Sequence, residues 1–300
     1  MKILLATDGS DYSDGAARFL SRFDFVQSDE ILVLHVIPGV PFPHSGGPYN
    51  AALMQIAEEL APRIIDATVG LLKGLRANVS TVVTTGHPAG AIMNVAAQSG
   101  PDIIVMGKRG MKAIGSLLLG SVTRAVAINA TRSVLVVKPP QEKADGPLKV
   151  LFATDGSDCA EETERVLSMI AFHAATNVTV VYASLSTYMD IPERFCSGMD
   201  ERIKKIVAGM KESEMDHSTK IVDQARTRLQ KKFRNVTVLI KNGDPSEQIL
   251  QAARETRPDV IALGSRGIRG VSGMLGSVAR NILGHAECSV LVCKRCKEKA

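Results

Sequence analysis

The sequence predicts an α/β protein of two similar, Rossmann-like, doubly wound domains, each with a parallel sheet flanked by helices. Three observations lead to this class: the chain has 300 residues, segments of its first half reappear in its second half, and short apolar runs alternate with helical patterns. At roughly 100 to 200 residues per domain, the length suggests about two domains. Two copies in 300 residues indicate duplication of a whole domain, because solenoid units have only about 20 to 50 residues.

Three segments carry the repeat, in the same order in both halves. The segment 2–11, KILLATDGSD, reappears as KVLFATDGSD at 149–158. The segment 101–110, PDIIVMGKRG, reappears as PDVIALGSRG at 258–267, and SVLVVK at 133–138 reappears as SVLVCK at 289–294. Between the copies, residues 139–147 have prolines at both ends and no apolar periodicity, which is typical of a linker. We therefore expect domains over residues 1–140 and 147–300.

Strands and helices are expected to alternate along each copy. In the first copy, apolar runs of strand length occupy residues 3–6, 31–37, 79–84, 103–106 and 134–137. Most of these runs lack polar alternation, as in strands that are covered on both faces. Helical spacing of apolar residues occupies residues 13–21, 51–75, 88–98 and 121–129. Ligands of such sheets bind beyond the carboxyl ends of the strands, so functional residues are expected there.

A glycine-rich segment directly follows the expected strand 103–106. Gly107 and Gly110 are separated by two residues, and nine residues later Gly120 and Ser121 open an expected helix. Glycines let backbone amides approach a ligand, and a helix N-terminus offers unpaired N–H groups and a positive dipole end. The alternative is an ordinary connection with a Ser N-cap. The position after a strand and the recurrence in the second copy favour a phosphate-binding loop.

An acidic residue follows the first strand of each copy, Asp8 in the first and Asp155 in the second. An acid at this place can hydrogen-bond a nucleoside or hold a metal ion beside phosphates. Its alternative role is an N-cap for the helix that follows. Because Asp8 shares a sheet edge with the glycine-rich loop, we expect the ligand role.

These motifs resemble the universal stress protein family, specifically its tandem members with two domains in one chain. The resemblance covers both halves nearly end to end and rests on the signature G-x-x-G-x9-G-S/T. It implies a five-stranded parallel sheet in the order 3-2-1-4-5 in each domain, and binding of ATP, with or without Mg²⁺. In the first copy, it implies that Thr7, Asp8, Val36 and Met106 surround the nucleoside. It implies phosphate contacts from Gly107, Arg109, Gly110, Gly120, Ser121 and Val122.

The second copy departs from this signature in two ways. Eight residues rather than nine separate Gly267 from Gly276, and Ala183 aligns with Val36. Loss of one residue can shift backbone amides by up to about 3 Å. We therefore expect the second site to bind more weakly or to hold another ligand. Its residues are Asp155, Gly264, Gly267, Gly276 and Ser277.

Composition narrows the classes of function. Hydrophobic residues make up 45% and charged residues 22%, as in soluble globular proteins, and no apolar run approaches the roughly 20 residues of a membrane span. The start of the chain lacks a secretory hydrophobic region, so we expect a cytoplasmic protein. A net charge of +5 spread over both halves, 4% aromatic residues and no Trp argue against nucleic-acid binding.

The cysteines and a charged insertion in the second half give weaker indications of function. The chain has five cysteines, which is an odd number, and none of them lies in the first half. This distribution does not fit a framework of disulfides, so we expect reduced thiols. Cys293 and Cys296 have CxxC spacing, which at best indicates a weak metal or redox site. The insertion within residues 190–214 contains Met199 and Met210, with Met215 just beyond it, and is expected to form an amphipathic lid or contact helix.

We expect a nucleotide-binding regulatory protein whose ATP occupancy changes its oligomerisation or its contacts with a protein partner that the sequence does not identify. The alternatives are an enzyme, namely a slow ATPase or a nucleotidyl transferase, and a scaffold with two degenerate sites. The motifs supply no candidate general base, which argues against the enzyme. The final strands, 134–137 and 290–293, are apolar sheet edges, and we expect them to pair within the chain as a pseudo-dimer. A further homodimer of the whole chain stays open.

Overall fold

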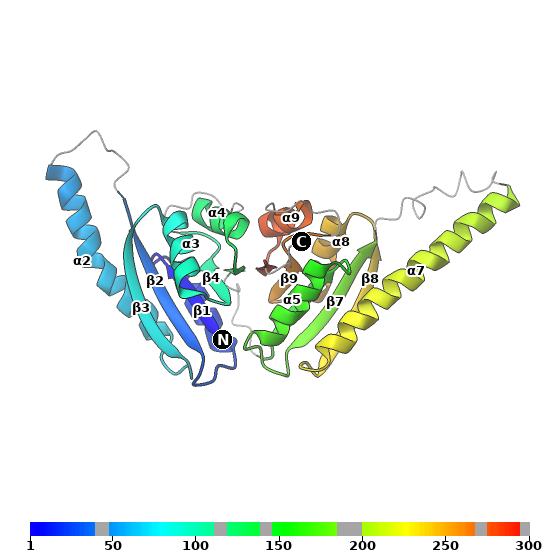
Figure 1. Ribbon diagram of the computed structural model, residues 1–300, viewed down its shortest axis with the longest axis horizontal. Coiled ribbons are helices and arrows are strands. Elements are labelled where there is room, and N and C mark those ends of the chain that lie inside the picture. The colour runs from blue at the N-terminus through cyan, green and yellow to red at the C-terminus, as the bar shows by residue number, and fades with distance from the viewer. Residues whose placement is uncertain (40–47, 111–118, 139–145, 185–199, 268–274, 295–300) are drawn as a thin grey trace.

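The computed structural model describes residues 1–39, 48–110, 119–138, 146–184, 200–267 and 275–294. Two α/β halves lie side by side in one molecule (Figure 1). Most of the expected linker, the central part of each glycine loop, Met199 and Cys296 lie outside the described residues.

The first half alternates strands and helices as predicted, with ends that differ by a few residues. Its strands are β1 (Lys2–Thr7), β2 (Glu30–Pro38), β3 (Asn78–Gly86), β4 (Ile103–Gly107) and β5 (Ser133–Val137). Its helices are α1 (Asp11–Phe19), the short 3-10 helix η1 (Leu20–Arg22), α2 (Pro48–Leu71), α3 (Pro88–Ser99) and α4 (Ser121–Asn129).

The second half repeats this plan with a longer helix in place of α2. Its strands are β6 (Lys149–Thr154), β7 (Asn177–Ser184), β8 (Asn235–Asn242), β9 (Val260–Gly264) and β10 (Ser289–Cys293). Its helices are α5 (Asp158–Met169), α7 (Glu201–Leu229), α8 (Pro245–Thr256) and α9 (Ser277–His285). The charged insertion therefore contributes to a long helix, α7, beginning at Glu201.

The strands form a ten-stranded sheet in the order β3-β2-β1-β4-β5-β10-β9-β6-β7-β8. Within each half the strands are parallel and follow the predicted order 3-2-1-4-5. The two halves meet where β5 pairs antiparallel with β10, with Leu135 opposite Leu291. The final strands therefore pair with each other, as the sequence predicts, and their backbone groups are not left at an edge.

Contacts outside the strand pair also join the two halves. Ser289 Oγ donates to Lys138 O at 3.3 Å, and Arg22 forms an ion pair with Asp259 at 2.6 Å. The rings of Phe23 and Phe172 pack edge to face with their centroids 5.0 Å apart. Polar, charged and aromatic contacts thus hold the domains together, in addition to the backbone hydrogen bonds between β5 and β10.

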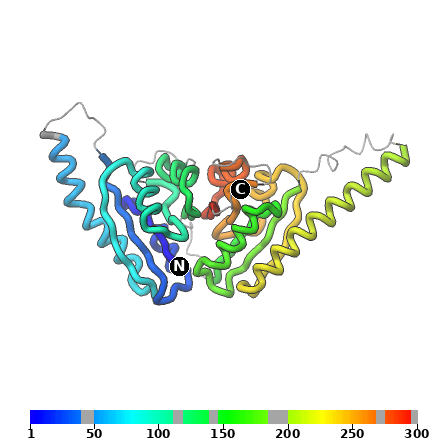
Figure 2. The backbone as a smooth tube through the Cα atoms, viewed as in Figure 1, coloured from blue at the N-terminus to red at the C-terminus, as the bar shows by residue number. Residues whose placement is uncertain are grey.

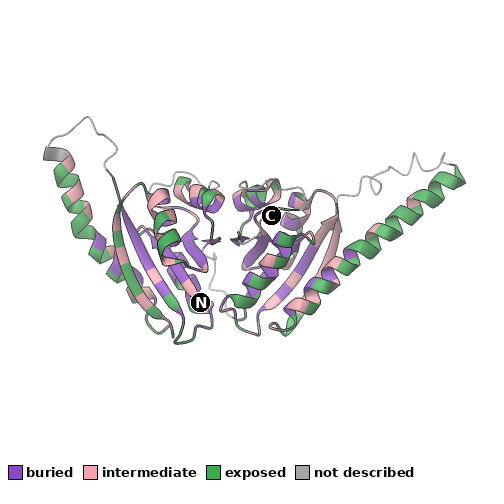
Figure 3. Ribbon diagram, viewed as in Figure 1, coloured by how far each residue is buried: buried purple, intermediate pink, exposed green. Residues whose placement is uncertain are grey.

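Helices cover both faces of the sheet. Helices α1, α2, α5 and α7 contribute to one hydrophobic core, and α3, α4, α8 and α9 to the other. Each core contains residues from both halves, so the hydrophobic packing is continuous across the β5–β10 pair. The central strands are buried and the outer ends of α2 and α7 are exposed (Figure 3).

The expectation that all cysteines are reduced is wrong for Cys159, which is disulfide-bonded. An odd cysteine count argues against a framework of several bridges, but it does not exclude one bond between two cysteines that folding brings together. Cys288 and Cys293 are free thiols, and burial raises the pKa of Cys293 to about 12. Within the described ranges, no group of three or more His, Cys, Asp or Glu residues is arranged to hold a metal ion. No helix there is long and apolar enough to span a membrane.

Candidate functional site

The turn after β1 orients Asp8 toward the glycine loop. Asp8 Oδ1 accepts hydrogen bonds from the backbone N (3.1 Å) and Oγ (2.6 Å) of Ser10. Ser10, and not Asp8, is the N-cap of α1, because its Oγ accepts from Ser13 N. Gly9 makes this turn possible with a φ of +77°, in the region that favours glycine. The carboxylate is therefore held by the turn and does not serve as the helix cap.

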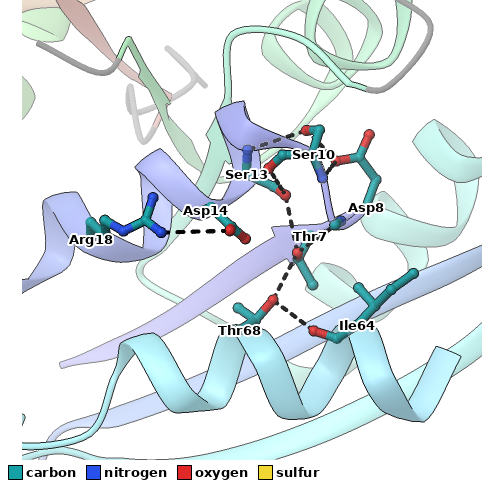
Figure 4. Close-up of polar contacts among 9 residues, drawn as sticks. Thr7, Asp8, Ser10, Ser13, Asp14, Arg18, Ile64 and Thr68 are labelled. Atoms are coloured by element: carbon teal, nitrogen blue, oxygen red, sulfur yellow. Dashed lines mark hydrogen bonds and ion pairs between the residues drawn. The ribbon is translucent and has the colours of Figure 1, made fainter. Parts of the chain in front are cut away.

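A buried network of hydroxyl groups fixes the end of β1 (Figure 4). Thr7 Oγ1 lies 3.2 Å from Ser13 Oγ and 3.0 Å from Thr68 Oγ1 of α2, and Thr68 Oγ1 donates to Ile64 O. On the neighbouring strand, His35 Nδ1 lies 3.0 Å from Thr7 O. Sequence analysis assigned Ser13, Thr68 and His35 no part in the site, because they belong to no motif. The network connects the end of β1, next to Asp8, to α1, α2 and β2.

Three glycines of the first loop lie where side chains would clash. A Cβ on Gly107 would lie 2.6 Å from the carbonyl C and O of Tyr12, and one on Gly110 would overlap Oδ2 of Asp8. A Cβ on Gly120 would lie 3.2 Å from the Cα of Arg109. Gly120 N also donates to Lys108 O at 3.0 Å, which closes the described ends of the loop. The structure thus brings Asp8 and the glycine loop together.

The first turn of α4 adds hydrogen-bond donors to the same edge. Within the described part of the chain, no side chain caps its N-terminus. Ser121 is exposed at that terminus, whereas the Val122 side chain packs against the core, so only the Val122 backbone is placed for a ligand. Thr123 Oγ1 donates to Gly107 O at 2.9 Å and ties the helix to the end of β4.

Basic side chains lie at and beside the described ends of the loop. Burial, and secondarily the charge of Arg109, lowers the pKa of Lys108, and burial and Lys108 lower the pKa of Lys138 to about 8. Arg109 is itself only 6% exposed. Concentrated positive charge beside free helical N–H groups is suited to an anionic ligand.

Two of the four residues expected around the nucleoside, Val36 and Met106, lie on strands that flank β1. Val36 is 7% exposed and Met106 is 5% exposed, and both side chains belong to the core under α3 and α4. Their side chains therefore offer little free surface, so a ligand at this edge could reach mainly their backbone.

In the second half, all five predicted residues line one cavity of about 420 Å³. Ala183, Thr154, Pro245 and Ile249 contribute to the same lining. Asp155 Oδ1 accepts from Ser157 N at 3.0 Å, and a Cβ on Gly267 would lie 2.6 Å from Asp155 Oδ2. The described geometry thus repeats that of Asp8 and Gly110.

The loop ends also match between the halves, although the loops differ in length. Gly276 N donates to Ser265 O at 2.8 Å, as Gly120 N does to Lys108 O. The extra residue of the first loop falls within residues 111–118, which lie outside the described residues, as do the corresponding residues 268–274 of the second loop. The described ends of the second loop therefore show no displacement of the kind expected from its length.

Comparison with known proteins gives a consistent result. The model of the universal stress protein family matches residues 1–138 and 148–294. A universal stress protein of Mycolicibacterium smegmatis is 27% identical over 301 residues, which cover 97% of this chain and 96% of the relative. One from Thermus aquaticus is 34% identical over 136 residues, which cover 45% of this chain and 97% of the relative.

Solved structures show the same fold over the whole length. The crystal structure of a universal stress protein from Archaeoglobus fulgidus superposes with a TM-score of 0.61 at 23% identity, covering 98% of each chain. Both halves are matched by the family model, and both have the strand order that the motifs predict. The chain therefore belongs to the universal stress protein family, as a tandem member.

Proposed function

We propose that the chain binds ATP at the carboxyl ends of β1 and β4 in its first domain and acts as a nucleotide-binding regulatory protein. The observation that carries this proposal is the close packing of Asp8 against Gly110, beside an α4 N-terminus without a side-chain cap in the described part of the chain. An acid for the nucleoside and N–H groups for phosphates therefore share one edge. The family resemblance, in which many members bind ATP, supports the choice of ligand.

The residues present fit this ligand. The phosphates would lie against the backbone of Gly110 and Gly120 and the first turn of α4, with Lys108 and Arg109 supplying charge. Asp8 would accept a hydrogen bond from the nucleoside. Mg²⁺ prefers phosphate oxygens and water to an all-protein site, so any Mg²⁺ would arrive with the nucleotide.

We further propose that the two domains bind ATP unequally. The position of Lys108 in the first loop is taken by Ser265 in the second, so the second loop lacks one cation. The smaller Ala183 also replaces Val36. We expect weaker ATP binding, or a different ligand, in the cavity beside Asp155.

Calorimetric titration of ATP into the whole chain tests both proposals. Asp8→Asn keeps an oxygen that accepts from Ser10 N but removes the charge, and Asp155→Asn is its matched control. We expect Asp8→Asn to weaken the tighter site at least tenfold, about 1.4 kcal/mol, and Asp155→Asn to leave that site unchanged. Failure to bind ATP, or two equivalent sites that respond alike, would contradict the respective proposal.

A single-turnover assay separates binding from catalysis. A regulatory protein releases ATP unchanged, whereas an ATPase converts it to ADP and a nucleotidyl transferase releases pyrophosphate from it, and Asp8→Asn or an equivalent change should remove either reaction. Steady hydrolysis by the wild type that is lost in the variant would replace the regulatory proposal with an enzymatic one.

A further inference from the structure

Lys138 directly follows β5 and carries a buried positive charge that no described residue satisfies. The residue is 8% exposed, and its Nζ is buried without a hydrogen-bond partner among the described residues. A cation in this position has lost its water and has gained no hydrogen bond in return, so it costs free energy in the folded protein. Charged groups kept in such surroundings are concentrated at functional sites, where a ligand supplies the missing contact.

A second cation, Lys108, lies beside Lys138 at the end of the neighbouring strand. The parallel strands β4 and β5 place Gly107 opposite Val137, and Lys108 N donates to Val137 O at 2.9 Å, so the pairing continues beyond both strands. Residues at the same level of adjacent strands point to the same face of the sheet, here the face that α4 covers. In agreement with this placement, burial and then the positive charge of Lys108 lower the pKa of Lys138 to about 8.

The other groups that act on Lys138 leave this pair of positive charges in excess. Cys288 and Glu287 raise the pKa of Lys138, but its net shift is downward. Burial raises the pKa of the Cys288 thiol to about 11, so this thiol is neutral at pH 7, and Glu287 is exposed to solvent. On the other side, the charge of Arg109 contributes to lowering the pKa of Lys108. Positive charge therefore accumulates at the ends of β4 and β5.

The end of β5 is the next position along the sheet edge after the proposed phosphate site. The strand order is β2-β1-β4-β5, so Asp8 after β1, the glycine loop after β4 and Lys138 after β5 follow one another along this edge. Neighbouring strands lie about 5 Å apart, which places the end of β5 roughly 10 Å from the end of β1. A nucleotide with its nucleoside at Asp8 and its first phosphates on the loop would therefore extend toward Lys138.

We propose that Lys138, together with Lys108, binds the terminal phosphate of the nucleotide and makes the first site selective for nucleoside triphosphates over monophosphates. This inference rests on the proposed ATP site of the first domain and adds to it a residue outside the glycine motif. Lys108 is only half-buried, and Ser121 is exposed at the start of α4, so a phosphate can approach from this edge. The flexible stem of a lysine lets its Nζ turn toward the phosphate, which then supplies a charge-assisted hydrogen bond.

The second domain lacks this pair of free cations. Lys294 occupies the position of Lys138, but its Nζ donates to Ile128 O of α4 at 2.8 Å. This contact crosses the centre of the molecule, where the green segment with α4 and β5 lies beside the red C-terminal segment (Figure 2). Ser265 takes the place of Lys108. We therefore expect the second site to discriminate less between triphosphates and monophosphates.

Calorimetric titration of the full chain with ATP and, separately, with AMP tests the inference. The first site is identified as the one that Asp8→Asn weakens. Lys138→Met removes the charge but keeps a long side chain, and we expect it to weaken ATP binding at the first site at least tenfold while AMP binding stays within about twofold of the wild type. Lys138→Arg keeps the charge and should keep the ratio of ATP to AMP affinity within about threefold.

The matched control is Lys294→Met, the same change at the equivalent position of the second domain. It should leave the ratio of ATP to AMP affinity at the first site unchanged, and urea unfolding checks that each variant is folded. Equal losses of ATP and AMP affinity in Lys138→Met, or an unchanged ATP affinity, would overturn this inference and leave the ATP site in place. A wild type that binds AMP as tightly as ATP at the first site would also overturn it. Absence of any ATP binding to the wild type would instead contradict the proposed function, and this inference with it.

Discussion

In the first domain Gly110 packs against Asp8, and in the second domain Gly267 packs against Asp155. The two turns are held alike, with each carboxylate accepting from the Ser N two residues later. The side chains on this common backbone differ, because Lys108 in the first loop corresponds to Ser265 in the second. Duplication has thus kept the geometry while the charge diverged.

The shorter second loop does not displace the described ends of that loop. The sequence shows one residue fewer in the second loop, and we expected its amides to shift. The described ends of both loops are closed by equivalent hydrogen bonds, and the second domain has a cavity of about 420 Å³. Any difference in affinity is therefore better sought in charge than in loop length.

The largest difference between the domains should appear when an alanine replaces the first glycine of each loop. In Gly107→Ala, the Cβ would lie 2.6 Å from backbone atoms of Tyr12, which move only if α1 moves. In Gly264→Ala, it would lie 3.0 Å from the Cβ of Cys159. We expect losses of roughly 2–3 kcal/mol and about 1 kcal/mol in the free energy of unfolding. Urea titration measures both, and equal losses would show that the first loop is not the tighter one.

A Cβ added at Gly110 would displace the Asp8 carboxylate. If Asp8 contacts the nucleotide, Gly110→Ala should weaken ATP binding in the first domain about 30-fold, or ~2 kcal/mol. Adding Asp8→Ala should then change little, because the carboxylate has already moved. Calorimetry of the two single variants and the double variant gives this coupling. Fully additive losses would indicate that Asp8 and Gly110 act independently.

The repeat and the buried strands allowed the fold to be predicted almost completely. Apolar runs without polar alternation correctly indicated strands covered on both faces, and the apolar final strands correctly indicated the pairing of β5 with β10. In the site, Asp8 and Gly110 were predicted together because parallel strands end at one edge.

Several residues that were not predicted belong to no motif and have partners far away in the chain. Thr68 meets Thr7 across 61 residues, and Arg22 meets Asp259 across 237 residues. The disulfide of Cys159 was not predicted either, since counting cysteines does not show which of them folding brings together. Local patterns therefore predicted the elements and the glycine loop, whereas polar contacts between distant segments needed the structure.

The ion pair between Arg22 and Asp259 joins the two domains and has no counterpart at the equivalent position of the second half. Both side chains are less than 20% exposed, Arg22 donates to both carboxylate oxygens, and Met169 occupies the position of Arg22 in the second half. Arg22→Met makes the first half like the second, and among the described residues it leaves the Asp259 carboxylate with the Lys149 N–H as its hydrogen-bond donor. We expect a loss of about 2 kcal/mol in the free energy of unfolding. Met169→Leu is the control and should change it by less than about 0.5 kcal/mol. Equal effects would show that this ion pair contributes nothing.

The smallest predicted effects concern the lysines that follow the two final strands. Burial lowers the pKa of Lys138 and of Lys294 to about 8. Lys294 Nζ donates to Ile128 O in the last turn of α4 at 2.8 Å, whereas Lys138 Nζ is buried without a hydrogen bond among the described residues. The two lysines therefore share a desolvation cost, but only Lys294 offsets it with a contact at a helix terminus.

An unfolded chain holds the Lys138 proton more tightly than the folded chain, because the folded pKa is the lower one. Wild-type stability should therefore rise as the pH increases from about 8 to about 10.5, and a neutral side chain should remove this part of the rise. We expect Lys138→Met to stabilise the protein by about 1 kcal/mol at pH 7 and to lose this advantage above pH 10.5. Lys294→Met removes the same cost but leaves Ile128 O without its donor, so it should be less stable than Lys138→Met by about 1 kcal/mol. Urea unfolding of both variants at pH 7 and pH 10.5 measures the difference. Identical behaviour of the two variants would mean that the hydrogen bond to α4 does not distinguish the domains.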